Sequence, residues 1–106
     1  MKRLLVLALV LAVAAAAAAL PALAATKTVD VGDNFFKPTR VGVRAGTKVV
    51  WKWTGSNPHN VTVTKGPKKF HSKTQTKGSF TAIPHTKGTY SIICTIHHFK
   101  MTLAVR

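Results

Sequence analysis

From residue 28 onward the sequence consists of short segments in which apolar and polar residues alternate, separated by turn residues. This period of two is typical of half-buried β-strands, because successive side chains of a strand point to opposite faces. The segments are residues 28–31, 40–44, 48–54, 61–64, 79–83, 89–94 and 101–105. Residues 25–106 keep no sustained helical period. Short strands at this spacing predict an all-β fold, a two-sheet sandwich or barrel around one core.

The order of the segments gives finer expectations. Residues 40–43 and 47–53 are joined through Gly46, which predicts a β-hairpin. The lysine-rich residues 65–77, with Phe70 as their anchor, predict a loop or a short irregular strand. The two tryptophans are interpreted as packing residues. The predicted core consists of apolar residues on one face of each segment: Val29, Val31, Phe36, Val41, Val43, Val49, Trp51, Val61, Val63, Phe80, Tyr90, Ile92, Leu103 and Val105.

Residues 1–24 are predicted to be a signal peptide and not part of the domain. A basic start precedes an uncharged run of Leu, Val and Ala, and residues 22–24, after Pro21, match the small-x-small cleavage pattern. We place cleavage after Ala24, with Ala25 as a close alternative. An uncleaved membrane anchor is the other interpretation, because the run can just span a bilayer. Cleavage leaves one domain, residues 25–106, exported to the periplasm, cell envelope or medium.

The charge of the chain is strongly unbalanced. Sixteen Lys and Arg against two acidic residues give a net charge of +14, which loss of Lys2 and Arg3 lowers to +12. Such a surface favours acidic partners and a salt-sensitive encounter with them. The chain contains no glutamate, and Asp30 and Asp33 are its only acids, so it is poorly equipped for acid–base catalysis by paired carboxylates. We expect no enzymatic activity.

Cys94 is the only cysteine of the chain. An exported domain with one thiol cannot form an internal disulfide, so the thiol needs another role. Cys94 ends a predicted strand, His97 follows three residues later, and His59 lies at the mouth of another predicted strand. These three side chains are candidate ligands of one metal ion. The other histidines are predicted surface residues, although the doublet at 97 and 98 leaves a one-residue ambiguity: His71, His85 and His98.

Two imidazoles and one thiolate are the trigonal donor set of a type 1 copper site, in which a thioether is the weak axial contact. Met101 is the available thioether. The residues therefore predict one copper ion, cycling between Cu(I) and Cu(II), with four ligands: His59, Cys94, His97 and Met101. Zinc is a further possibility, since one cysteine and two histidines also suit a tetrahedral zinc site.

Over about residues 36–105 the sequence resembles the plastocyanin and amicyanin type of small cupredoxin. The resemblance is carried by Phe36-Lys37-Pro38, Val41-x-Val43-x-x-Gly46, Val49-x-Trp51, Pro58-His59-Asn60-Val61, Gly88-Thr89-Tyr90 and Cys94-x-x-His97. It implies an eight-stranded Greek-key sandwich with copper at one end, held by ligands from an early loop and from the loop between the last two strands. It also implies that Asn60 ties these loops together. Electrons would leave through His97, amid an apolar patch to which Phe99 and Pro58 contribute.

The sequence departs from this family at the axial position. Family members usually have His-x-x-Met or His-x-x-x-x-Met, whereas the spacing here is His97-x-x-x-Met101. In one common variant a second methionine starts the final strand and is purely structural, and Met101 can correspond to that residue. Phe99 or Lys100 would then occupy the axial position, and the copper would be three-coordinate or bind a backbone oxygen or water.

These features predict a monomeric one-electron carrier whose positive surface guides it to an acidic oxidase, dehydrogenase or membrane partner. A copper protein for storage, delivery or sensing at the cell envelope is the alternative. Such sites tend to be exposed and rich in Met or His, whereas the predicted mature domain has one methionine. A basic module that binds nucleic acid, anionic polymers or lipid is a third possibility. No aromatic stacking pattern accompanies the basic residues, so we expect no specific nucleic acid partner.

Overall fold

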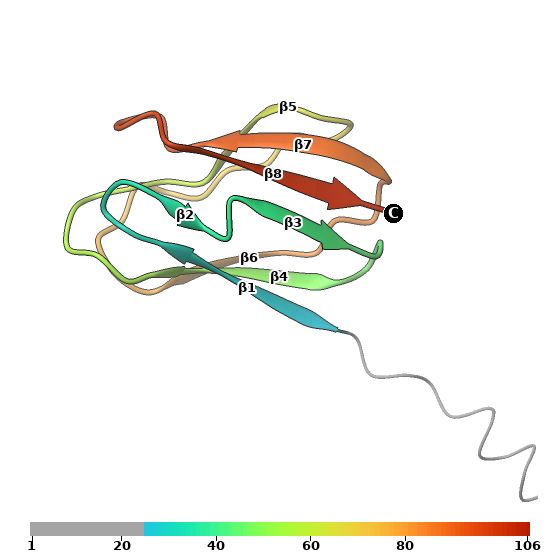
Figure 1. Ribbon diagram of the computed structural model, residues 1–106, viewed down its shortest axis with the longest axis horizontal. Helices are drawn as coiled ribbons and strands as arrows, with labels where there is room; N and C mark the ends of the chain where they lie inside the picture. Colours follow the sequence, from blue (N-terminus) through green and yellow to red (C-terminus); the bar gives the residue numbers. More distant parts are fainter. Residues whose placement is uncertain (1–24) are drawn as a thin grey trace, which may run out of the picture.

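The computed structural model describes residues 25–106, which form eight β-strands in two four-stranded sheets (Figure 1). One sheet has the order β2-β1-β4-β6 and the other β3-β8-β7-β5. The strands are β1 (Thr26–Val31), β2 (Phe36–Lys37), β3 (Arg40–Val43), β4 (Lys48–Trp53), β5 (Thr62–Lys65), β6 (Ser79–Ala82), β7 (Gly88–Ile93) and β8 (Lys100–Val105). The predicted all-β sandwich of about eight strands is confirmed. The predicted signal peptide lies outside the described residues.

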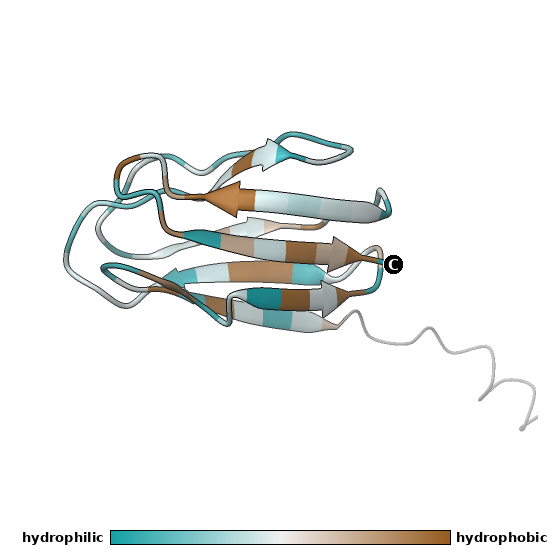
Figure 2. Ribbon diagram, turned by 45° about the horizontal axis from the view of Figure 1, so that its top comes forward, coloured by the Kyte–Doolittle hydropathy of each residue, from teal (hydrophilic) through white to brown (hydrophobic). Residues whose placement is uncertain are grey.

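Alternating burial along the strands explains why the two sheets pack face to face. In β4 and in β8 every second residue is buried, and the bands of opposite hydropathy along the strands are visible in Figure 2. Thirteen of the fourteen predicted core residues are buried, and Phe80 is partly buried against them. Trp53, Cys94 and Met101 also belong to this core. Burial of these apolar side chains is the main favourable contribution to folding.

The predicted hairpin of residues 40–43 and 47–53 is wrong. β3 pairs in parallel with β8 in one sheet, whereas β4 pairs with β1 and β6 in the other. The turn at Gly46, where φ is 89°, carries the chain across the sandwich from one sheet to the other. Alternation fixes which face of each strand is buried, and two neighbouring strands satisfy it equally well as a hairpin or on opposite sides of one core.

The segment between β5 and β6 has an irregular backbone, as its composition predicts. It folds back along Val61 and the start of β5, where Ser72 N donates to the Val61 carbonyl (2.8 Å) and Val63 N donates to the Phe70 carbonyl (3.0 Å). The Phe70 ring packs near Trp51, with ring centroids 6.0 Å apart. The segment between β5 and β6 thus covers one side of the core without adding a regular strand.

Among residues 25–106, no helix is long and apolar enough to cross a membrane.

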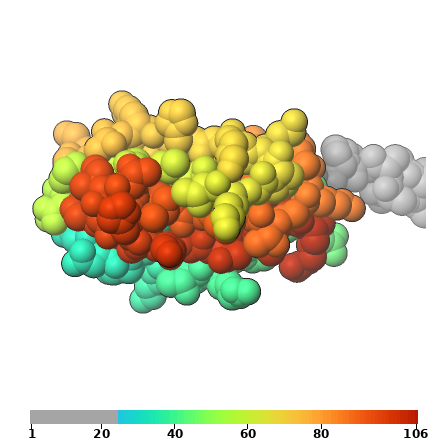
Figure 3. Space-filling model, turned by 90° about the horizontal axis from the view of Figure 1, so that it is seen from above, coloured from blue at the N-terminus to red at the C-terminus, as the bar shows by residue number. Residues whose placement is uncertain are grey.

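Three loops meet at one end of the sandwich. They follow β1, β4 and β7, and the chain segments near residues 33, 57 and 97 gather at the same tip in Figure 3. β1 and β4 are parallel, so both strands deliver their following loops to the same end. The C-terminus lies at the opposite end (Figure 1). This tip contains all the residues of the candidate site except Met101, which lies just below it in β8.

Candidate metal centre

His59 lies in the connection between β4 and β5 and is fully buried. Its backbone is held on both sides by Gln75, because His59 N donates to the Gln75 carbonyl and Gln75 N donates back, both at 3.0 Å. The position of the imidazole is therefore set by the irregular segment before β6. This contact could not be predicted from the sequence, since Gln75 lies in a polar stretch that resembles an ordinary loop.

Cys94 is the first residue after β7 and is also fully buried. Its N–H donates to the Phe99 carbonyl (3.0 Å), and its carbonyl accepts the N–H of His98 (2.8 Å). These bonds close a tight loop from which the exposed side chain of His97 projects. His98 is exposed and has a positive φ of 65°, and the donor cluster contains His97 and not His98.

The donor atoms of His59, Cys94 and His97 converge. Cys94 Sγ lies 3.8 Å from His59 Nδ1 and 3.9 Å from His97 Nδ1, and the two Nδ1 atoms are 3.0 Å apart. Bonds of about 2.0–2.3 Å from nitrogen and sulfur to a first-row metal ion place such donors roughly 3–4 Å from one another. The observed spacing fits one shared ion. Within residues 25–106, no other group of three His, Cys, Asp or Glu side chains is arranged to hold a metal.

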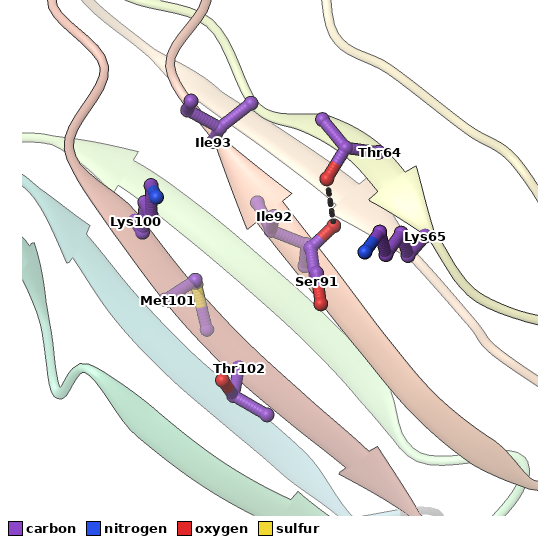
Figure 4. A pocket seen from close by; sticks show the side chains of 8 residues that line it. All are labelled: Thr64, Lys65, Ser91, Ile92, Ile93, Lys100, Met101 and Thr102. Atoms are coloured by element: carbon purple, nitrogen blue, oxygen red, sulfur yellow. Dashed lines mark hydrogen bonds between the residues drawn. The ribbon is translucent and has the colours of Figure 1, made fainter.

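Met101 lies in β8, paired with Ile92 of β7 (Figure 4). Its side chain is buried. Its sulfur accepts a hydrogen bond from Trp51 Nε1 at 3.2 Å. A thioether sulfur has a second lone pair that this bond leaves free. The axial role of Met101 stays a prediction. Trp51, which was predicted to be a packing residue, also makes a polar contact with this sulfur.

Asn60 connects the two ligand loops, as the family resemblance implied. Its Oδ1 accepts the backbone N–H of Thr95 (3.1 Å), and its Nδ2 donates to the Thr95 hydroxyl (2.8 Å). Oδ1 also accepts the Thr62 hydroxyl at 2.8 Å. Because Asn60 follows His59 and Thr95 follows Cys94, the amide fixes the relative position of two ligands. Buried amides with several partners of this kind rigidify a site.

Phe99 forms an apolar wall beside the imidazoles. Its ring centroid lies 5.2 Å from that of His59, 6.4 Å from that of His97 and 4.8 Å from that of Phe36. Phe99 is partly buried against the core, so its contribution to an exposed patch is smaller than expected. Ile96, directly before His97, is instead the large apolar side chain at the surface, 45% exposed. Pro58 is exposed as predicted, and so are His71 and His85.

Sequence reasoning missed Asp33, the acidic contact of the site. Asp33 Oδ1 accepts the backbone N–H groups of Asn57 (2.9 Å) and Ser56 (3.0 Å) and lies 3.1 Å from His59 Nε2. The Asn57 N–H and the hydrogen-bonded imidazole of His59 hold the pKa of Asp33 below its ordinary value. The sequence contained one relevant signal, since Asp33 is one of only two acids in a strongly basic chain.

The chain is similar in fold to several solved structures. It aligns with a variant of oxidized amicyanin at 21% identity and a TM-score of 0.68, over 79% of this chain and 90% of that chain. A purple cupredoxin from Nitrosopumilus maritimus gives 22% identity and a TM-score of 0.65, with 76% and 99% covered. The copper-containing nitrite reductase (NirK) from Thermus scotoductus SA-01 gives 22% identity and a TM-score of 0.67. That alignment covers 82% of this chain but only 23% of the reductase chain.

The TM-scores of 0.65 to 0.68 show a common fold. No curated protein matches the sequence. Residues 3–105 match the family described as the cupredoxin-like domain, which is nearly the whole chain. Together with the two-sheet sandwich and the convergent donors at its tip, this match shows that the chain belongs to the cupredoxin-like domain family.

Proposed function

We propose that this cupredoxin binds one copper ion and carries single electrons between partner proteins. The observation that carries the proposal is the convergence of one thiol sulfur and two imidazole nitrogens within 3.0–3.9 Å of one another. If both imidazoles are protonated at Nε2, the two Nδ1 atoms present lone pairs to each other at 3.0 Å. A cation between them removes that repulsion. A thiolate with two imidazoles is the donor set that suits copper electron transfer.

The candidate axial ligand is Met101. Its buried sulfur has one hydrogen bond, from Trp51, and a second lone pair that is available to a metal. The bound copper would supply a couple between Cu(I) and Cu(II). Zinc suits the same histidines and cysteine but has no redox chemistry.

The residues around the donors have separable roles. Cys94 and His59 are fully buried, which keeps bulk water from the sulfur and from one imidazole. The backbone bonds of His59 to Gln75 and the loop bonds of Cys94 hold the donors in place, and a fixed ligand set suits a centre that must change charge without rearrangement. The exposed ring of His97 is the route by which an electron would reach a partner.

We further propose that the redox partner of this protein has an acidic docking surface. The net charge of +12 after removal of residues 1–24 supports this, since positive surfaces steer association with acidic ones. A groove on the outer face of the β3-β8-β7-β5 sheet has Lys65 on one side of Ser91 and Lys100 on the other (Figure 4). Ile93 in this groove directly precedes Cys94, so an acidic group bound there would lie near the metal centre.

The proposed place of action is outside the cytoplasm, and the proposed role is non-enzymatic. The lone buried thiol supports export, since a metal would protect it where thiols are prone to oxidation. Three converging donors come from a single copy of residues 25–106, which supports a carrier that acts as a monomer.

Cyclic voltammetry of the copper-loaded protein tests the carrier function. Residues 25–106 contain the whole sandwich and are the form to use. We expect a reversible one-electron couple that persists over repeated scans, and we expect His59→Ala to abolish it. His71→Ala is the matched control, because it removes an exposed histidine that lies outside the donor cluster. Irreversible loss of the metal on reduction would instead support copper delivery.

A further inference from the structure

We propose that Asp33 is a positioning residue of the metal centre: it holds the His59 ring with Nδ1 toward the other donors and places a negative charge behind that ligand. The inference rests on the proposed copper function. Asp33 lies in the loop between β1 and β2, 26 positions from the histidine that it contacts. Its role therefore depends on the fold and not on local sequence.

The carboxylate is fixed by its own contacts. One oxygen, Oδ1, accepts the backbone N–H groups of Ser56 (3.0 Å) and Asn57 (2.9 Å) and the Nε2 group of His59 (3.1 Å). The two backbone donors belong to the same loop as His59. Asp33 thus anchors the loop and the imidazole at one point.

The surrounding backbone is shaped to bring this carboxylate close. A Cβ atom at Gly55 would overlap the Asp33 carboxylate, so a residue with a side chain there would push the two loops apart. On the other side, Gly32 N donates to the Phe35 carbonyl at 2.9 Å and closes the turn that presents Asp33. The Phe35 ring lies against Gly32, where a Cβ atom would overlap it. Two glycines therefore permit the contact.

The contact determines which nitrogen of His59 carries the proton. A carboxylate only accepts hydrogen bonds, so Nε2 must be the donor and Nδ1 keeps a lone pair in the neutral ring. That lone pair faces Cys94 Sγ at 3.8 Å and His97 Nδ1 at 3.0 Å. His59 is 0% exposed, so bulk water does not compete for Nε2. Carboxylate partners of this kind orient histidine ligands and raise their basicity.

The charge of Asp33 is the second part of its role. A negative charge hydrogen-bonded to a ligand stabilises the more positive oxidation state of the metal, Cu(II), relative to Cu(I). Asp30, the other acid of the chain, pairs on the sheet with Lys37 and Lys52 and is not in the donor cluster. The two acids therefore make a matched comparison, because each contributes one charge and only one contacts a candidate ligand.

The test compares Asp33→Asn with Asp30→Asn in residues 25–106. Asparagine keeps an oxygen that can accept the same N–H groups, so Asp33→Asn should fold while losing the charge. We expect its affinity for Cu(II) to fall about 10–100-fold, as is typical when the partner of a histidine ligand is changed. We also expect its reduction potential to become more positive. Asp30→Asn should change neither quantity appreciably. Equal shifts in the two variants would overturn the inference.

Nitrogen NMR of the metal-free protein tests the positioning role without copper. His59 should carry its proton on Nε2 in the wild-type protein and in Asp30→Asn, and Asp33→Ala should produce a mixture of tautomers. A proton on Nδ1 in the wild-type protein would overturn the inference whatever the metal result. A protein with the expected tautomer but no thiolate–copper absorption would contradict the copper function instead, so the two failures are distinguishable.

Discussion

The Met101 sulfur occupies a position in which two roles are compatible with its contacts. It accepts the Trp51 indole N–H at 3.2 Å and lies on the inward face of β8, whose first residue follows the ligand loop. As an axial ligand, it would donate its remaining lone pair to copper. As a strand residue, it would only fill the core beside Trp51. The redox potential separates these roles, because the axial ligand tunes it in copper sites of this type.

For Met101→Leu we expect the reduction potential to rise, because loss of a weak thioether donor destabilises Cu(II) relative to Cu(I). The swap nearly conserves volume and should cost less than about 1.5 kcal/mol of stability. Voltammetry and the visible spectrum of the copper-loaded variant are the measurements. Leu103→Met is the matched control, since Leu103 is the next inward residue on the same strand. An unchanged potential in Met101→Leu would assign the residue to the core alone.

Residue chemistry explains how much of the candidate site was predictable. Cys94, His59 and His97 could be chosen because the single thiol of a chain predicted to be exported needs another role than a disulfide, and the two histidines suit the same metal ion. The contacts of Asp33, Gln75 and Trp51 with the site could not be predicted. Each of these residues contacts a candidate ligand that only the fold brings close, and the sequence around each residue does not indicate which ligand that is.

At the scale of elements, alternation predicted which side of each strand is buried but not every strand or pairing. The two-residue strand β2 is too short to show a period, so only its buried Phe36 was anticipated. β3 and β4 were expected to pair because they are adjacent in sequence. In the structure they lie in different sheets, and β3 pairs with β8 near the C-terminus. Pairing depends on contacts distant in sequence, which a period of two does not encode.

Composition also predicts the role of a loop incompletely. The segment between β5 and β6 has a composition typical of a solvated loop, yet its backbone bonds hold His59 and its Phe70 covers the core. Its lysines remain exposed, whereas its backbone is structural. The polar composition of this segment therefore predicts its exposed side chains but not the structural role of its backbone.

For the molecule as a whole, we propose that the excess of basic residues speeds the encounter with acidic partners. We expect electron exchange with anionic hexacyanoferrate to slow as ionic strength rises from 0.01 to 0.15 M, because the screening length falls from about 30 to about 8 Å. Lys100→Gln, beside the ligand loop, should slow the low-salt reaction more than Lys48→Gln, at the far end of β4. Stopped-flow kinetics provide the rates. A rate that is independent of salt would argue against electrostatic steering.

We propose above all that Cys94, His59 and His97 bind one copper ion at the tip of the sandwich. The most direct test of this proposal is the visible absorption of residues 25–106 loaded with Cu(II), compared with Cys94→Ala. We expect an intense band from thiolate-to-copper charge transfer in the wild-type protein and its complete loss in the variant. A colourless Cu(II) complex, or a band that survives removal of the sulfur, would contradict the proposal.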